Sequence, residues 1–222
     1  DGVWVHLQRE KQKSTEVRVA IMSTGRKPVG KDRYRLENKH CLTAIGLNSQ
    51  QWQEHILREA HLTYDLEHTH LLVCGGDGNR WVRHSFDRLQ IKQEFILDRF
   101  HLLRAARRAI ADSQVSKTVI TRLRQEGLES VRSDLQKQIQ QATGNQRKKL
   151  EDFYRYIHNN QDGLLDLQYR SDVVPACLGA IEGNVDKLVV HRMKGRGCSW
   201  RLRGLRAMLA LCRNSDALKH HS

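Results

Sequence analysis

Three carboxylates, Asp1, Asp77 and Glu182, stand where they could hold divalent metal ions together. Asp1 opens a run in which apolar and polar residues alternate, Asp77 directly follows a short apolar run, and Glu182 lies in a segment with helical spacing. Two Mg2+ ions about 4 Å apart can activate the attacking oxygen and stabilise the leaving oxygen at a phosphodiester, and Mg2+ prefers oxygen ligands. Each residue alone has an ordinary alternative, a turn for an aspartate and a solvent-facing helix position for the glutamate. As a set they are predicted to be the catalytic residues and the ligands of Mg2+, with Mn2+ as a substitute.

The sharpest local feature surrounds Asp77, where the sequence reads Gly75-Gly76-Asp77-Gly78. Glycines lack the bulk of a Cβ atom, so a metal ion and a phosphate could approach the backbone here. The spacings of dinucleotide-binding and nucleoside-triphosphate-binding loops are absent. The alternative interpretation is a plain turn with an Asp-Gly tip.

A basic segment rich in glycine follows Glu182 and would lie beside the predicted metal site. Its cations are predicted to position a nucleic-acid backbone, and Trp200 could stack on bases, although a tryptophan is more often a core residue. His101 could contact a phosphate, or it could serve as a capping or core residue. The residues predicted to contact DNA are Arg80, Trp81, His101, Arg192, Lys194, Arg196 and Trp200.

The first part of the chain is expected to form strands. Val3, Val5 and Leu7 alternate with polar or aromatic residues, a period of two that indicates a strand with one face in the core. Residues 16–22 repeat the alternation, so the two runs are predicted to form a hairpin. Residues 26–39 are expected to be a loop or an extended edge.

Helical and buried elements alternate further on. Ser49 is predicted to cap a helix, whose apolar residues recur at a spacing of four. The continuous apolar runs at 71–74 and 95–97 indicate buried strands, and the second leads into a helix at 99–104. The apolar residues of the first helix are Trp52, Ile56 and Ala60.

A helical insertion is predicted from about residue 113 to 170, with breaks near Gly127, residues 143–145 and Gly163. Pro175 would then open the last helix, because proline is tolerated in a first turn. Glu182 flanks the apolar stripe of that helix, formed by Leu178, Ile181, Val185 and Leu188. The predicted domain boundaries are 1–112 for the first part of the core, 113–172 for the insertion and 173–222 for the last part of the core.

The overall composition favours a partner that is a polyanion. The 222 residues include 38 Lys and Arg against 25 Asp and Glu, a formal charge of +13. Ribosomal and membrane-surface proteins share this balance. The five cysteines contain no C-x-x-C pair, which argues against a disulfide framework or a zinc ribbon. No apolar run reaches the length of a membrane span, so a soluble protein in an intracellular setting is expected, and the strand at the start indicates a fragment of a longer chain.

Four blocks, taken in order, resemble the bacterial insertion-sequence transposases of the DDE type, in particular the ISLre-type group. The resemblance implies an α/β fold of the ribonuclease H type, a mixed sheet of about five strands flanked by helices, with an all-helical insertion before the last catalytic helix. It also implies that Asp1, Asp77 and Glu182 are the first, second and third catalytic carboxylates, and that the enzyme cleaves DNA and transfers strands with Mg2+. The blocks are residues 1–8 (DGVWVHLQ), 76–81 (GDGNRW), 97–101 (LDRFH) and 179–200 (GAIEGNV to RMKGRGCSW).

The function that the resemblance implies is therefore that of a transposase catalytic domain, located in the bacterial cytoplasm in association with the nucleoid. The expected partners are double-stranded DNA, as transposon ends and target, and further copies of the chain assembled on DNA, with no membrane. Two alternatives remain open: a ribonuclease H-like nuclease that only hydrolyses, and a catalytically inactive DNA-binding module derived from a transposase.

Overall fold

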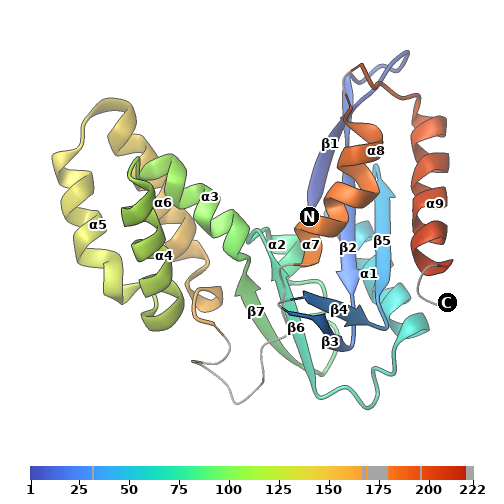
Figure 1. Ribbon diagram of the computed structural model, residues 1–222, viewed down its shortest axis with the longest axis horizontal. Helices are drawn as coiled ribbons and strands as arrows, with labels where there is room; N and C mark the ends of the chain where they lie inside the picture. The colour runs from blue at the N-terminus through green and yellow to red at the C-terminus, as the bar shows by residue number, and fades with distance from the viewer. Residues whose placement is uncertain (32, 167–168, 170–179, 196, 219–222) are drawn as a thin grey trace. The chain divides into compact units, whose positions relative to one another are not determined.

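The chain folds into two compact units, which we describe one at a time. Unit 1 comprises Asp1–Thr69, His84–Asp87 and Gly179–Ser222, and unit 2 comprises His70–Arg83 and Arg88–Leu178. The computed structural model describes residues 1–31, 33–166, 169, 180–195 and 197–218 (Figure 1). Pro175 and Leu178, predicted to begin the last helix, lie outside these residues.

Unit 1 is built on an antiparallel sheet of three strands in the order β1-β2-β5. Val3 pairs with Val17 and Val5 pairs with Thr15. The alternation in the sequence therefore places the side chains of Val3 and Val5 on the same face of the sheet. The predicted hairpin is confirmed, and the stretch expected to be a loop or an extended edge contains two antiparallel strands, β3 and β4, between β2 and β5 in sequence. The strands are β1 Gly2–His6, β2 Ser14–Met22, β3 Gly25–Gly30, β4 Arg33–Glu37 and β5 His40–Ile45.

One face of this sheet is covered by the last segment of the chain. Val5 and Val19 are fully buried there against Leu188 and Leu205. Ile181 and Val185 also pack on this core, as the apolar stripe predicts. The covering elements are α7 Ala180–Val185, the π-helical turn η3 Asp186–Val190, α8 His191–Met193 and α9 Leu202–Leu218.

Helix α1, Ser49–Thr63, contacts β5. Its predicted apolar residues Trp52, Ile56 and Ala60 are buried. The cap is Asn48 rather than Ser49: the Asn48 side chain accepts from Gln51 N at 2.9 Å, and the Gln51 side chain accepts from Asn48 N at 3.0 Å. This reciprocal pair satisfies two backbone N–H groups at the start of the helix.

Unit 2 combines a parallel strand pair with the helical segment. β6, Leu71–Gly76, pairs in parallel with β7, Lys92–Leu97, from Leu71 opposite Lys92 to Gly76 opposite Leu97. The short helix α2, Arg80–Arg83, lies between them in sequence. Four longer helices follow, and they are α3 Arg99–Ala109, α4 Ser113–Glu126, α5 Glu129–Gln141 and α6 Gly144–Asn159.

The helices of unit 2 break where the sequence indicates. Gly127 ends α4 with a φ of +79°, and Gly144 begins α6 with a φ of +54°, both in the left-handed region that favours glycine. A 3-10 turn, η1 at Gln161–Gly163, follows α6. Leu123, Leu135 and Ile157, from three different helices, are among the most completely buried side chains.

The protein is thus a mixed α/β structure, as predicted. Its described strands form three small sheets: the antiparallel β1-β2-β5, the hairpin β3-β4 and the parallel β6-β7. A single five-stranded sheet of the ribonuclease H type is not confirmed. Among the described helices, none is long and apolar enough to cross a membrane.

Candidate active site

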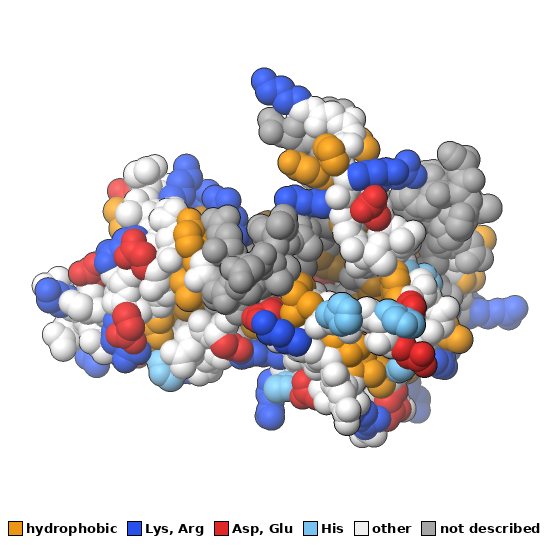
Figure 2. Space-filling view, turned by 90° about the horizontal axis from the view of Figure 1, so that it is seen from below, with side chains coloured by type: hydrophobic (Ala, Val, Ile, Leu, Met, Phe, Trp, Pro, Cys, Tyr) orange, Lys and Arg blue, Asp and Glu red, His pale blue; other side chains and the backbone are white. Residues whose placement is uncertain are grey.

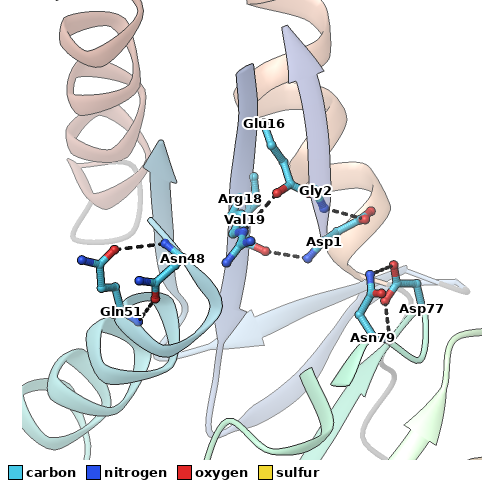
Figure 3. Close-up of polar contacts among 9 residues, drawn as sticks. All are labelled: Asp1, Gly2, Glu16, Arg18, Val19, Asn48, Gln51, Asp77 and Asn79. Atoms are coloured by element: carbon cyan, nitrogen blue, oxygen red, sulfur yellow. Dashed lines mark hydrogen bonds and ion pairs between the residues drawn. The ribbon is translucent and has the colours of Figure 1, made fainter. Parts of the chain in front are cut away.

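Asp77 occupies the turn that ends β6, as the sequence predicts. Its Oδ1 accepts from Asn79 N at 3.0 Å, and its Oδ2 accepts from the Asn79 side-chain amide at 2.6 Å (Figure 3). An aspartate that bonds the backbone two residues ahead stabilises a turn locally. The carboxylate is therefore held in one orientation at the carboxyl end of a parallel strand.

The glycines beside Asp77 serve close packing within the protein. A Cβ on Gly76 would stand 2.9 Å from Val82 Cγ1, and one on Gly78 would stand 2.8 Å from Asn160 Cγ. Gly78 also has a φ of +91°. We expected these glycines to leave room for a metal ion and a phosphate. In the direction of an added Cβ, the space over both glycines is occupied by side chains of unit 2.

Tyr156, on α6, holds the main chain of the same turn. Its hydroxyl donates to the carbonyl oxygen of Asp77 at 2.9 Å. Burial, followed by the negative charges of Asp77 and Asp98, raises the pKa of the Tyr156 phenol well above its usual value of 10. The hydroxyl therefore stays protonated and remains a donor at every pH below its ordinary pKa.

Asp98 is a second carboxylate at this edge and was not part of the predicted site. Its N–H donates to Gly76 O at 2.8 Å, which continues the parallel ladder past β7. The residue is 4% exposed, and its side chain accepts from Phe100 N at 2.7 Å, which caps α3. Parallel strands bring their carboxyl ends to one edge of a sheet. The positions of Asp77 and Asp98, each directly after an apolar run, could therefore have indicated that both carboxylates lie at the same edge.

Asp1, in unit 1, extends the β1–β2 ladder by one pair. Its N–H group donates to Val19 O at 2.8 Å, and its carbonyl accepts from Val19 N at 2.8 Å (Figure 3). Its Oδ1 accepts from Gly2 N at 2.8 Å. Strand alternation places Asp1 on the same face as Val3, which is the face that the last helices cover.

Glu182 lies on α7, and its side chain is outside the described part of the structure. α7 contacts β2, and Figure 1 shows the start of the chain beside α7. Unit 1 therefore brings Asp1 and the helix of Glu182 to the same end of its sheet, while Asp77 belongs to unit 2. Among the side chains that the structure describes, no three carboxylate, histidine or cysteine groups are gathered closely enough to hold a metal ion.

The three predicted DNA contacts in unit 2 differ in exposure. Arg80 is exposed, at the start of α2. Trp81 is half-buried against the core of the unit. His101 is half-buried on α3, with its ring edge-on to Phe100 at a centroid distance of 5.4 Å. Arg80 is thus the most accessible of the three.

The predicted DNA contacts in unit 1 follow Glu182. Arg192 and Lys194 are exposed, and Arg196 lies outside the described residues. Trp200 is partly buried against the core, and its indole N–H donates to Met193 O at 3.1 Å. Gln8 N donates to Trp200 O at 2.9 Å. Through these hydrogen bonds, Trp200 links the basic segment to the end of β1.

Comparison with known proteins identifies relatives without a stated activity. A UPF0236 protein of Caldanaerobacter subterraneus subsp. tengcongensis, whose name joins eleven designations from TTE0033 to TTE2212, is 25% identical over 178 residues, which is 79% of this chain and 37% of that protein. UPF0236 protein TTE2489 of the same organism is 27% identical over 150 residues, 67% of this chain and 32% of that protein. This chain thus spans about a third of the length of these two relatives. No solved structure matches it. A family model described as "Uncharacterised protein family (UPF0236)" matches residues 1–217, and the chain belongs to this family.

Proposed function

We propose that this chain is the catalytic domain of a DDE-type DNA transposase, which cleaves DNA strands and transfers them to a target in a Mg2+-dependent reaction. The observation that carries the proposal is the position of Asp77. It ends a parallel strand, its carboxylate is oriented by Asn79, and its main chain is held by Tyr156. A rigid carboxylate at the carboxyl end of a parallel strand is suited to a ligand site.

The order of the elements supports the same proposal. An antiparallel set, β1, β2 and β5, comes first, then α1, then the parallel pair β6 and β7. We propose that these five strands are the strands of a ribonuclease H-like sheet, with α4 to α6 as the insertion. In that arrangement Asp1, Asp77 and Glu182 are the three carboxylates of one site.

The donor chemistry of the described carboxylates fits Mg2+. Asp77 offers carboxylate oxygens, the ligands this ion prefers, and each oxygen has lone pairs beyond the one that its Asn79 contact uses. Bound Mg2+ would polarise the phosphate and activate the attacking hydroxyl. The part of Asn79 and Tyr156 is to keep the Asp77 carboxylate in place, so that little reorganisation is needed when the ion binds.

The names of two relatives also support the proposal that this chain is encoded by a mobile genetic element. One joins eleven designations within a single organism, and another joins four. Several designations for one protein are the pattern expected where near-identical copies of a gene recur, as copies of an insertion sequence do.

The proposal is tested by the charge-removing variants Asp77→Asn and Glu182→Gln, with Asp152→Asn as the matched control. Asp152 is on α6 and pairs with Arg155 on the surface. We expect each site variant to lower Mg2+-dependent cleavage of duplex DNA by at least about 100-fold, with DNA binding in EDTA unchanged, and the control to cleave normally. Cleavage retained by both site variants would refute the proposal. Cleavage by the wild type without strand joining to a target plasmid would indicate a nuclease.

A further inference from the structure

Helix α3 carries four arginines and no acidic residue between its ends. These are Arg99, Arg104, Arg107 and Arg108. The buried stripe of the helix is formed by Leu102, Ala106 and Ala109. At 100° per residue, Phe100, Arg104, Arg107 and Arg108 fall on a common face opposite that stripe. All four of these side chains are exposed, Phe100 to 50%. We call them the α3 face.

The arginines of the α3 face differ from most others in unit 2. Elsewhere in the unit, six arginines of the helices form ion pairs with carboxylates, and these pairs are Arg83 with Asp162, Arg122 with Asp134, Arg124 with Asp166, Arg132 with Glu129, Arg147 with Glu151 and Arg155 with Asp152. Figure 2 shows Asp and Glu side chains lying among Lys and Arg over the helical part at its left. Within the described residues, Arg104, Arg107 and Arg108 have no ion pair or hydrogen bond of their side chains.

This arrangement is unfavourable for the free protein. Arg104 stands three and four residues before Arg107 and Arg108, spacings at which like charges repel on a helix. The last turn of α3 can accommodate Arg107 and Arg108, because cations are favourable near a helix C-terminus. Arg104 lies in the middle of the helix and gains no such benefit. A bound polyanion would remove the repulsion among all three.

Within unit 2, α3 begins beside the proposed catalytic turn, and the α3 face extends away from it along the helix. α3 begins immediately after Asp98, whose N–H donates to Gly76 O, the residue before Asp77. From Arg104 to Arg108 the helix rises about 6 Å, while one DNA strand advances about 3.4 Å per phosphate. Three guanidinium groups over this length can reach two or three consecutive phosphates.

We propose that the α3 face binds the sugar-phosphate backbone of DNA beside the Asp77 turn. The choice of DNA as the polyanion rests on the proposed function. Arginine is suited to this contact, because its planar fork of donors matches phosphate oxygens and remains charged at every physiological pH. Phe100, at the start of the same face, adds an exposed ring within reach of the bound strand.

The test compares two variants that each lose three positive charges from unit 2. The first is Arg104→Gln, Arg107→Gln and Arg108→Gln together, and the matched control is Arg122→Gln, Arg147→Gln and Arg155→Gln together. Binding to a fluorescent DNA duplex is measured in EDTA over a series of KCl concentrations. Each lost phosphate contact lowers the slope of log affinity against log salt by about 0.9. We expect the slope of the first variant to fall by about 2 to 3, and that of the control to stay near the wild-type value.

Equal slopes for the two variants would overturn the proposal, because net charge rather than the α3 face would then govern binding. An unchanged slope in the first variant would overturn it as well. Thermal unfolding of both variants checks the fold, and the first is expected to melt near the wild-type temperature, since the repulsion that its substitutions remove offsets the favourable interaction of Arg107 and Arg108 with the helix C-terminus. Binding in EDTA does not depend on catalysis, so a chain that binds through α3 but never cleaves would refute the proposed function and leave this inference standing.

Discussion

The hydroxyl of Tyr156 donates a hydrogen bond of 2.9 Å to the main-chain carbonyl of Asp77, so the last helix of the helical segment holds the turn after β6. Asn160, one turn further on, donates to Tyr156 O at 2.8 Å and fills the space over Gly78. Arg83 donates to Asn159 O at 2.8 Å. The end of α6 is therefore joined to the Asp77 turn at several points, and the helical segment has a structural part in the candidate site.

Tyr156→Phe is predicted to loosen this turn while keeping the buried ring. The loss of one hydrogen bond from a phenol should lower the free energy of unfolding by about 1 kcal/mol. Because the bond fixes the main chain of Asp77, Mg2+-dependent cleavage should fall mainly through kcat, and DNA binding in EDTA should not change. Tyr154→Phe is the matched control, since Tyr154 lies half-buried on the same helix. Equal kcat values for the two variants would contradict this role of Tyr156.

Gly78→Ala is predicted to destabilise the protein by more than the cost of its backbone conformation. Alanine at a φ of +91° is strained by about 1 kcal/mol, and its methyl would also overlap the Asn160 side chain. Gly144→Ala is the matched control, because Gly144 has a φ of +54° and a Cβ there would have no atom of the described residues within 4 Å. Urea denaturation of both variants measures the difference. Equal losses of stability would mean that the Asn160 side chain moves away from the new methyl group at no cost in free energy.

Much of the local structure could be predicted from the sequence, because short-range patterns decide it. The alternation of Val3 and Val5 gave the correct face of β1, and the spacing of Trp52 and Ile56 gave the buried side of α1. The cap of α1 was misplaced by one residue. Asn48 and Ser49 are both good caps, and the choice of Asn48 depends on the Gln51 side chain, which completes the reciprocal pair.

The partners of Asp77 could not be predicted in the same way. Tyr156 lies 79 residues away in the sequence, and the periodicity of a helix reveals which face is buried but not which strand it meets. For the same reason, the sequence did not show that β6 and β7 share a compact unit with the helical segment. Asp98 was visible as the end of a strand, but its closeness to Asp77 follows from the parallel pairing of β6 with β7.

Arg83→Lys is predicted to destabilise unit 2. The Arg83 guanidinium donates to Asn159 O, pairs with Asp162 and lies over the Phe95 ring, with its Cζ 4.7 Å from the centroid. A lysine cannot reproduce the planar fork or the stacking, so we expect a loss of about 1 to 3 kcal/mol in the free energy of unfolding. Arg80→Lys, at an exposed position of the same helix, should change stability by less than about 0.5 kcal/mol. Chemical denaturation distinguishes them, and equal stabilities would show that the Arg83 contacts contribute nothing net.

The stability of the protein is predicted to fall at high pH in a way that depends on Tyr156. The pKa of this phenol is raised in the folded state above the ordinary value of 10. The protonated phenol therefore contributes fully to the free energy of unfolding below about pH 10, and this contribution is lost as the pH rises through the folded-state pKa. Above about pH 10 the unfolded chain ionises this tyrosine while the folded chain does not, which favours unfolding. The unfolding free energy of the wild type minus that of Tyr156→Phe should then fall by up to about 1.4 kcal/mol per pH unit, which is enough to make the variant the more stable of the two at about pH 11. Urea denaturation of both proteins at about pH 9 and pH 11 measures it, since all other titrating groups are common to the two. A difference that stays constant over this range would show that Tyr156 ionises with a similar pKa in both states.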